Sequence, residues 1–189
     1  SDGGSIFGAA AAKGCIAVGA INASDPGNDD IAYYSSRGPA RIAHPTFELR
    51  NKPDICGIDG VDVTGAGGFS DPFYGTSAAA PHLAGLAALL FDLHESWNVD
   101  SMRNALTSTA VDLGEPGFDY TFGHGRADVL KASGLGEIWA GEVGSQVWGA
   151  DDSPYEVFGD LTVIEGATLT IEPGVEVRMR PDVSIVVEG

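Results

Sequence analysis

Basic residues are scarce in this sequence, and their scarcity excludes a class of partner. The chain has 10 lysines and arginines against 27 aspartates and glutamates, which gives a net charge of -17. Because so acidic a surface repels phosphate backbones and anionic lipids, we expect neither nucleic acid nor an anionic membrane as a partner. The excess of carboxylates is typical of a solvated surface that keeps a protein dispersed in water.

Cysteines and long apolar runs are also scarce. Cys15 and Cys56 are too few for a disulfide framework, and they either pair once or remain thiols. No Cys-x-x-Cys motif and no cluster of cysteine and histidine occurs, so we expect no zinc site. Without a run of about 18 apolar residues, we expect no membrane span. The chain starts at Ser1 with neither methionine nor signal peptide, and we expect it to be a fragment of a longer protein.

A continuous apolar run predicts a strand that is buried on both faces, as in a parallel sheet, and a second short buried strand is expected further along the chain. The first covers residues 15–21 and the second residues 53–57. Between them, residues 31–35 are expected to form a short strand and residues 40–52 an irregular surface excursion.

The clearest helix is expected to begin near Ser77 and to end near Leu93. Its residues are apolar nearly all round, which is typical of a helix buried in the middle of a domain. Pro81 is expected in or near the first turn, where its missing N–H costs little. Two shorter helices are expected over residues 100–109, with Asn98 or Asp100 as the cap, and over residues 128–132.

The composition changes after residue 134 and becomes strand-like near the carboxyl end. Residues 135–160 are expected to be a linker, and residues 161–189 the beginning of a β-rich module. Three short strands are expected there, separated by Gly-containing turns, over residues 161–163, 169–171 and 175–179. Short strands at even spacing are typical of stacked rungs, although a plain β-sandwich fits this much sequence as well.

A serine lies at the start of the long helix, two residues after Gly75, which permits a tight turn. At this position backbone N–H groups point outward and the helix dipole is positive, which favours a developing oxyanion. Ser77 is therefore a candidate nucleophile. The local alternative is that Thr76 or Ser77 only caps the helix.

The sequence around Ser77 favours the nucleophile over the helix cap. Residues 74–85, Tyr-Gly-Thr-Ser-Ala-Ala-Ala-Pro-His-Leu-Ala-Gly, resemble the nucleophile signature of the subtilases, a family of serine proteases, in which Gly75, Thr76, Pro81 and His82 support the serine. Further segments are similar to the family in the same order, namely 15–21, the Ser-Ser-Arg-Gly-Pro turn at 35–39, the Lys-Pro-Asp-Ile strand at 52–55, and the closing segments 106–114 and 123–128. The resemblance covers roughly residues 5–132.

The resemblance implies a partial subtilisin-like α/β fold, with a mostly parallel sheet around a central buried helix. It implies a Ser-His-Asp triad of which Ser77 alone is present here, since the family's aspartate, histidine and oxyanion asparagine would precede Ser1. The Ser77 backbone N–H would be an oxyanion donor, and His82 would be structural. A polypeptide is the implied substrate, and Ile6, Phe7 and Gly8 are expected to help line the primary specificity pocket.

Several features depart from the family or depend on it. After Lys-Pro-Asp-Ile the family usually continues with Ala-Pro-Gly or a variant with Asp-Gly, but here Ile58 replaces the proline, so the loop geometry there is not specified. Cys15 and Cys56 would lie on strands of one sheet, where free thiols are favoured because adjacent parallel positions seldom suit a disulfide. Calcium is frequent in the family, but the acidic loop 25–30 is more typical of a solvated turn, and no metal site is assigned.

None of the four histidines is a good substitute for the general base. His82 diverges from Ser77 around the helix, and His94 is about 25 Å further along it at a rise of about 1.5 Å per residue. Nothing places His44 or His124 near the serine. We therefore expect the isolated chain to be inactive, and the full-length parent to be a serine endopeptidase.

The segment from residue 161 resembles the opening of right-handed parallel β-helix modules, which suggests contact with a cell surface or a polysaccharide. Together the two resemblances imply a secreted or cell-surface protease. The alternative is a non-catalytic surface or adhesion protein that uses a degenerate subtilase-like domain as a scaffold.

Overall fold

The computed structural model describes residues 4–135 and 138–189, and the chain forms two compact units, Ser1–Ala132 and Ser133–Gly189. The elements of the first unit are η1 (Gly8–Ala11), β1 (Val18–Asn22), β2 (Ala40–Ile42), β3 (Glu48–Arg50), β4 (Ile55–Asp59), η2 (Ala66–Gly68), α1 (Thr76–Leu93), α2 (Val99–Ser108) and α3 (Val129–Ser133), the last of which ends just past its boundary. Those of the second are β5 (Ile138–Val143), β6 (Gln146–Trp148), η3 (Ala150–Asp152), β7 (Tyr155–Val163), β8 (Leu169–Ile171), β9 (Val177–Met179) and β10 (Ile185–Val187).

A parallel pair of strands, β1 and β4, forms the centre of the first unit. The register runs from Val18 opposite Ile55 to Asn22 opposite Asp59, and both strands are largely buried. The two predicted buried strands are confirmed, although each begins two or three residues later than expected. Because both strands end at the same edge of the sheet, Asn22 and Asp59 lie side by side there.

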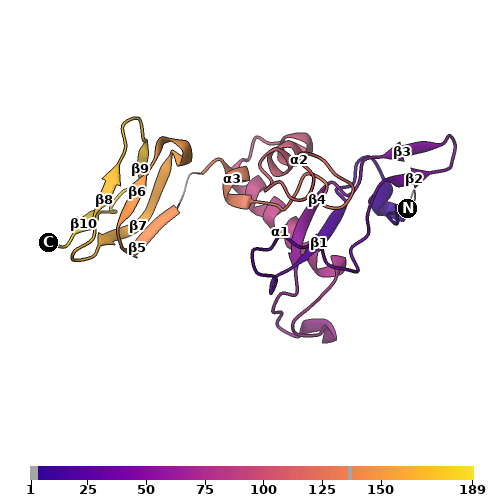
Figure 1. Ribbon diagram of the computed structural model, residues 1–189, viewed down its shortest axis with the longest axis horizontal. Coiled ribbons are helices and arrows are strands. Elements are labelled where there is room, and N and C mark those ends of the chain that lie inside the picture. The colour runs from indigo at the N-terminus through magenta and orange to yellow at the C-terminus, as the bar shows by residue number, and fades with distance from the viewer. Residues whose placement is uncertain (1–3, 136–137) are drawn as a thin grey trace. The chain divides into compact units, whose positions relative to one another are not determined.

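Helix α1 packs against both strands, as Figure 1 shows, and so the unit has an α/β fold. The predicted start near Ser77 and end at Leu93 are confirmed. The expectation of burial on all sides is wrong for the described residues, since Leu89 and Leu93 are 64% and 47% exposed. Only β1, β4 and α2 cover the helix appreciably in this part of the chain. The core between them contains Ile55, Leu83, Leu90, Met102, Leu106 and Ala132.

The composition of α1 also bears on membranes. Its 18 residues have a mean hydropathy of 1.2, so by length and composition it could cross a bilayer, contrary to the expectation from the sequence. Core helices of soluble proteins pass the same test. The packing of α1 on a parallel strand pair is that of a core helix.

Helix α2 begins as predicted from its cap. Its Asn98 side-chain oxygen accepts a hydrogen bond from the Ser101 N–H at 2.9 Å, which satisfies one of the free donors of the first turn. The third predicted helix is α3, shifted by one residue.

Two expectations about the segment between β1 and β4 are wrong. Residues 31–35 form no strand, because the Ser35 N–H turns back to the Ala32 carbonyl and the Ser35 hydroxyl accepts the Ala20 N–H. Instead only Ile31 makes an isolated bridge, to Ile21. The expected irregular excursion contains an antiparallel hairpin of β2 and β3.

The Lys-Pro-Asp-Ile motif fastens the start of β4 to its neighbours. The Asp54 carboxylate accepts hydrogen bonds from three groups: the Lys52 ammonium at 2.6 Å, the Arg103 guanidinium of α2 at 3.0 Å and the Ala17 N–H at 2.6 Å. Lys52 is 3% exposed and also donates to the Cys15 carbonyl. This ion network therefore joins β4, α2 and the chain just before β1.

Every strand pair of the second unit is parallel. Strand β7 pairs with β5, β9 and β10, and β6 pairs with β8, so the sheets are open in the described residues. This parallel pairing differs from the antiparallel pairing of the plain sandwich considered above. The core consists of Val143, Trp148, Tyr155, Val157, Leu161 and Val163.

The expectation that residues 135–160 form a linker is wrong. It contains β5, β6 and the first part of β7, and the Trp148 ring stacks on Tyr155 at 4.6 Å inside the core. Of the predicted strands, 161–163 is the end of β7, 169–171 matches β8, and 175–179 begins two residues later as β9.

Candidate active site

The start of α1 shows that Ser77 is not a helix cap. The cap is Gly75, with φ 103° and ψ 166°, and no side chain caps the helix there. Ser77 is the second residue of the helix and is exposed. The interpretation of Thr76 or Ser77 as the helix cap is therefore wrong, and the Ser77 hydroxyl is not used in capping. No hydrogen bond involves this hydroxyl within residues 4–135 and 138–189.

Free backbone donors accompany the hydroxyl. The Gly75 carbonyl accepts the N–H groups of Ala78 and Ala79, at 2.8 and 3.1 Å. In the part of the chain that the structure describes, the Thr76 and Ser77 N–H groups have no hydrogen-bond partner. Such unpaired donors at the positive end of a helix can accept a developing negative charge.

Pro81 lies deeper in the helix than the sequence suggested. It is inside α1, one turn after Ser77, and not within the first turn. A proline here cannot donate to the carbonyl four residues earlier, which belongs to Ser77. The Ser77 carbonyl therefore lacks the regular helical hydrogen bond from position 81.

A buried carboxylate holds the residue before this turn, and the sequence gave no role to it. Asp59, at the end of β4, is fully buried. Its Oδ2 accepts the Gly75 N–H at 2.6 Å and also the Tyr34 hydroxyl. Its Oδ1 has no hydrogen-bond partner among the described residues. The one departure that the sequence showed nearby was Ile58, which stands where the family usually has proline.

Burial and the neighbouring Asp59 carboxylate raise the pKa of Tyr34 to about 12. The phenol thus keeps its proton well above neutral pH and remains a hydrogen-bond donor to Asp59. Asp59 and Tyr34 escaped the sequence analysis because their contact joins residues far apart in the chain.

The histidines lie in distinct environments. The His82 ring Nδ1 lies 3.2 Å from the Ile58 carbonyl, so His82 links α1 to the end of β4. His94 stacks on Trp97 with ring centroids 3.9 Å apart. His124 packs edge-on against Phe118, while its backbone N–H donates to the Asp54 carbonyl. Within the described residues, the Ser77 hydroxyl is hydrogen-bonded to none of the four histidines.

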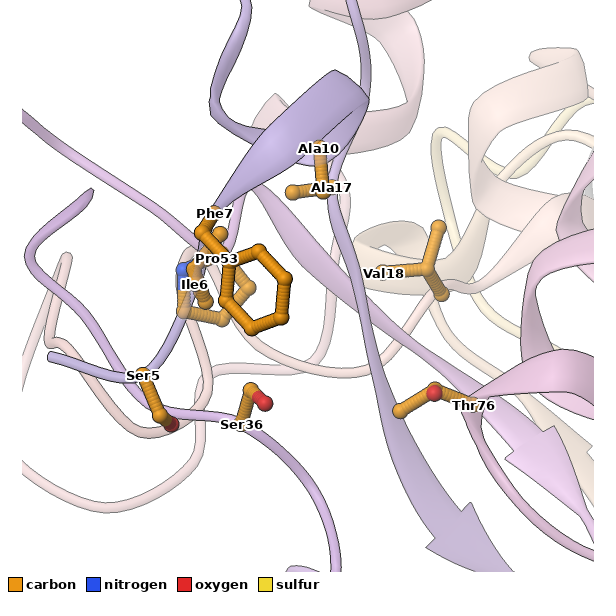
Figure 2. Close-up of a pocket in the computed structure, with 9 residues that line it drawn as sticks. All are labelled: Ser5, Ile6, Phe7, Ala10, Ala17, Val18, Ser36, Pro53 and Thr76. Carbon is orange, nitrogen blue, oxygen red and sulfur yellow. The ribbon is translucent and has the colours of Figure 1, made fainter. Parts of the chain in front are cut away.

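A small cavity lies beside the start of α1, and Figure 2 shows its lining. Its volume is about 140 Å³, and Ile6, Phe7 and Thr76 are among its walls. Gly8, the third residue expected in the specificity pocket, is not part of this lining. The remaining walls are Ser5, Ala10, Ala17, Val18, Ser36 and Pro53.

The two cysteines are free thiols. Cys56 pairs in register with Gly19, whereas Cys15 precedes β1, so the two are not neighbours on adjacent strands as expected. Burial, with a smaller effect of Asp119, raises the pKa of Cys56 to about 12.

In the acidic loop, one oxygen of the Asp25 carboxylate accepts the N–H groups of Asp29 and Asp30, so that this oxygen stabilises the turn.

Comparison with known proteins agrees with this geometry. The family model described as Subtilase family matches residues 3–125. Subtilisin-like protease SBT1.4 of Arabidopsis thaliana is 30% identical over 179 residues, covering 80% of this chain and 22% of the relative. Subtilisin E of Bacillus subtilis is 31% identical over 118 residues, covering 62% of this chain and 26% of the relative. The chain therefore spans about a quarter of the length of these relatives.

A solved structure shows the same fold. Fervidolysin from Fervidobacterium pennivorans, a keratinolytic enzyme related to subtilisin, has a TM-score of 0.50 and 22% identity, covering 77% of this chain and 23% of that one. The relatives named above are proteases by name, and the family model covers well over half of the chain. The chain belongs to the subtilase family of serine proteases.

Proposed function

We propose that this chain is part of a serine endopeptidase in which Ser77 is the nucleophile. The observation that carries the proposal is the start of α1, where an exposed serine hydroxyl and an unpaired backbone N–H lie together. The general base and its aspartate come from outside these 189 residues, in the order typical of the family.

The chemistry assigned to Ser77 is acyl transfer. The Ser77 Oγ attacks the carbonyl carbon of a peptide bond, and its proton passes to a histidine from outside this segment. The carbonyl oxygen becomes an oxyanion, which accepts the Ser77 N–H. When the tetrahedral intermediate collapses, the C–N bond breaks and the leaving amine takes the proton from the histidine. A water molecule then cleaves the ester by the same steps.

The residues of this chain supply no general base of their own, in this proposal. His82 is engaged with the Ile58 carbonyl, and His94 lies about 25 Å along the helix from Ser77 at about 1.5 Å per residue. The 189-residue chain alone is therefore expected to be inactive, because loss of the base cripples serine activation.

We also propose that Ile6 and Phe7 help to hold a side chain of the polypeptide substrate. They share a cavity with Thr76, the residue next to the nucleophile, which favours a site for the residue at the scissile bond. The open, partly apolar cavity of about 140 Å³ suits a small or medium apolar side chain. Gly8 does not enter this proposal.

A fluorophosphonate probe, which phosphorylates activated serines, tests the nucleophile. The probe is applied to the protein that contains these residues in its natural gene context, and the labelled peptide is identified by mass spectrometry. We expect labelling at Ser77 that Ser77→Ala abolishes. Ser101→Ala is the matched control, since Ser101 lies in the first turn of α2 but its hydroxyl contacts the Asn98 side chain. Absence of labelling would favour the scaffold alternative.

For the second unit we propose a coil of the parallel β-helix type that acts in extracellular surface or polysaccharide contact. The parallel pairing supports it, since Tyr155 lies opposite Val177 and Leu161 opposite Ile185, 22 and 24 positions further on. In the full-length parent, a truncation after residue 134 is expected to retain hydrolysis and to lose retention on cell-wall polysaccharide. Equal retention of both forms would refute the assignment.

A further inference from the structure

The carboxylate of Asp59 contacts the residue from which the nucleophile helix starts. Its Oδ2 lies 2.6 Å from the backbone nitrogen of Gly75, two residues before Ser77. The same oxygen accepts the hydroxyl of Tyr34, whose ring comes from the loop after β1. A single oxygen therefore joins three segments: the end of β4, the Tyr34 loop and the start of α1.

Stability alone is a poor reason for a carboxylate at this place. Asp59 is fully buried, no basic side chain pairs with it in the described residues, and its Oδ1 has no hydrogen-bond partner there. Burial of a charge without a counter-ion and with a free oxygen destabilises a fold. On the neighbouring strand, Asn22 lies at the register position opposite Asp59, and its side-chain oxygen accepts the N–H and hydroxyl of Ser24, while its side chain also hydrogen-bonds to Tyr34. Costs of this kind are concentrated at functional sites.

The geometry of Gly75 explains what the contact can achieve. Its φ of 103° lies in a region that glycine tolerates, and no side chain caps the helix. The chain before it is held at Phe73 by a backbone bridge to Val61, which leaves Gly75 itself to the Asp59 contact. A charge-assisted hydrogen bond to its N–H sets the direction in which the chain enters the helix. The bond is anchored on β4, which pairs in register with β1, and is therefore held by the sheet and not by the loop.

We propose that Asp59, steadied by Tyr34, is a positioning residue that holds Gly75 and thereby aims the Ser77 hydroxyl and N–H for acyl transfer. This inference rests on the proposed function for its catalytic part, and on the contact itself for its structural part. Asp59 does not touch the substrate. It acts through the backbone of Gly75.

Hydrogen exchange of the Gly75 amide measures the contact without requiring activity. The amide is followed at single-residue resolution by mass spectrometry in the protein that contains these residues. In Asp59→Leu, which keeps the number and branching of the heavy atoms but is larger and has no acceptor, we expect exchange about tenfold faster or more, as for loss of a hydrogen bond to a charged group. In Asp59→Asn, which retains one acceptor oxygen, we expect an intermediate rate.

The catalytic part is read from the same variants by fluorophosphonate labelling of Ser77. We expect the maximal labelling rate to fall in the order wild type, Asp59→Asn, Asp59→Leu, while the probe concentration at half-maximal rate stays within about twofold, because Asp59 acts on orientation and not on probe binding. The melting temperature of Asp59→Asn is expected to be at least that of the wild type. Asp62→Asn removes the same charge from an exposed position on the same segment and should change none of these quantities.

The outcomes separate the two claims. Unchanged Gly75 exchange in a folded Asp59→Leu overturns the inference. Faster exchange with an unchanged labelling rate also overturns it, because the contact would then have no effect on the nucleophile. Absence of labelling in the wild type refutes the proposed function, and with it the catalytic part, while the exchange rates still decide the contact. Loss of labelling in proportion to a lowered melting temperature would show a purely structural role.

Discussion

Removal of the Asp54 carboxylate is the perturbation that tests the fold most directly. In Asp54→Ala, the ammonium of Lys52 keeps its place, 3% exposed, but loses its counter-ion. The N–H of Ala17 and the guanidinium of Arg103 lose their acceptor as well. The substitution thus leaves a buried cation and a partly buried amide unsatisfied while creating no compensating contact.

The expected loss is large for a single substitution. Breaking a buried ion pair by removing one partner costs about 3–5 kcal/mol. The Arg103 side chain is 20% exposed and can turn to water, so its share is below about 1 kcal/mol. We expect Asp54→Ala to lower the free energy of unfolding by about 3–4 kcal/mol, and a Lys52→Met, Asp54→Leu double variant to recover most of it, since apolar replacement of both partners is often neutral.

Urea unfolding followed by circular dichroism measures these differences, with the slope against urea checked for constancy. Asp92→Ala is the control, because Asp92 is exposed on α1, and a surface substitution should stay within about 0.5 kcal/mol. A loss below about 1 kcal/mol for Asp54→Ala, with an unchanged slope, would refute the view that the ion network fastens β4 to α2.

Three further predictions concern pH, thiol chemistry and backbone space. Burial and Asp59 raise the pKa of Tyr34 from 10.0 to about 12, so its contribution to the free energy of unfolding is complete below pH 10 and is lost as pH rises toward 12. In denaturant titrations across this pH range, Tyr34→Phe should lose less free energy of unfolding than the wild type. Iodoacetamide should modify Cys15 in the native protein and spare Cys56, whose pKa of about 12 leaves little thiolate; equal labelling in a peptide map would contradict this. Gly125→Ala should lower the free energy of unfolding by at least about 2 kcal/mol in urea titrations, since φ is 108° and the added Cβ would lie 2.0 Å from the Val111 carbonyl oxygen; a neutral effect would show that the closing turn can move.

A continuous apolar run and a long motif made part of this fold predictable. The run at 15–21 and the short strand expected at 53–57 indicated the parallel pair because strands buried on both faces lack alternation. The Gly-Thr-Ser motif placed the start of α1 within one residue of its observed start at Thr76. These signals are local, and a single sequence displays them directly.

Features that depend on contacts between distant segments were not predictable. Residues 31–35 have strand-like composition, yet the Ser35 hydroxyl bonds to the Ala20 N–H and bends the chain into a turn. The position of Asp59 gave no hint that Tyr34 and Gly75 would meet on its carboxylate. The strands in residues 135–160 were missed because the apolar Trp148 and Tyr155 lie among polar and glycine residues that read as a linker.

The parallel pairing of the second unit also constrains how its sequence can change in length. In the coil proposed for this unit, each strand would pair with one about a full circuit later in the chain, as Tyr155 pairs with Val177. Deletion of one residue within a strand would send every following side chain to the opposite face, out of the core. Insertion of an entire circuit would add one layer and leave the facing of the other side chains unchanged. Such a unit can therefore be lengthened by whole circuits, whereas insertion or deletion of a single residue is tolerated only at the turns.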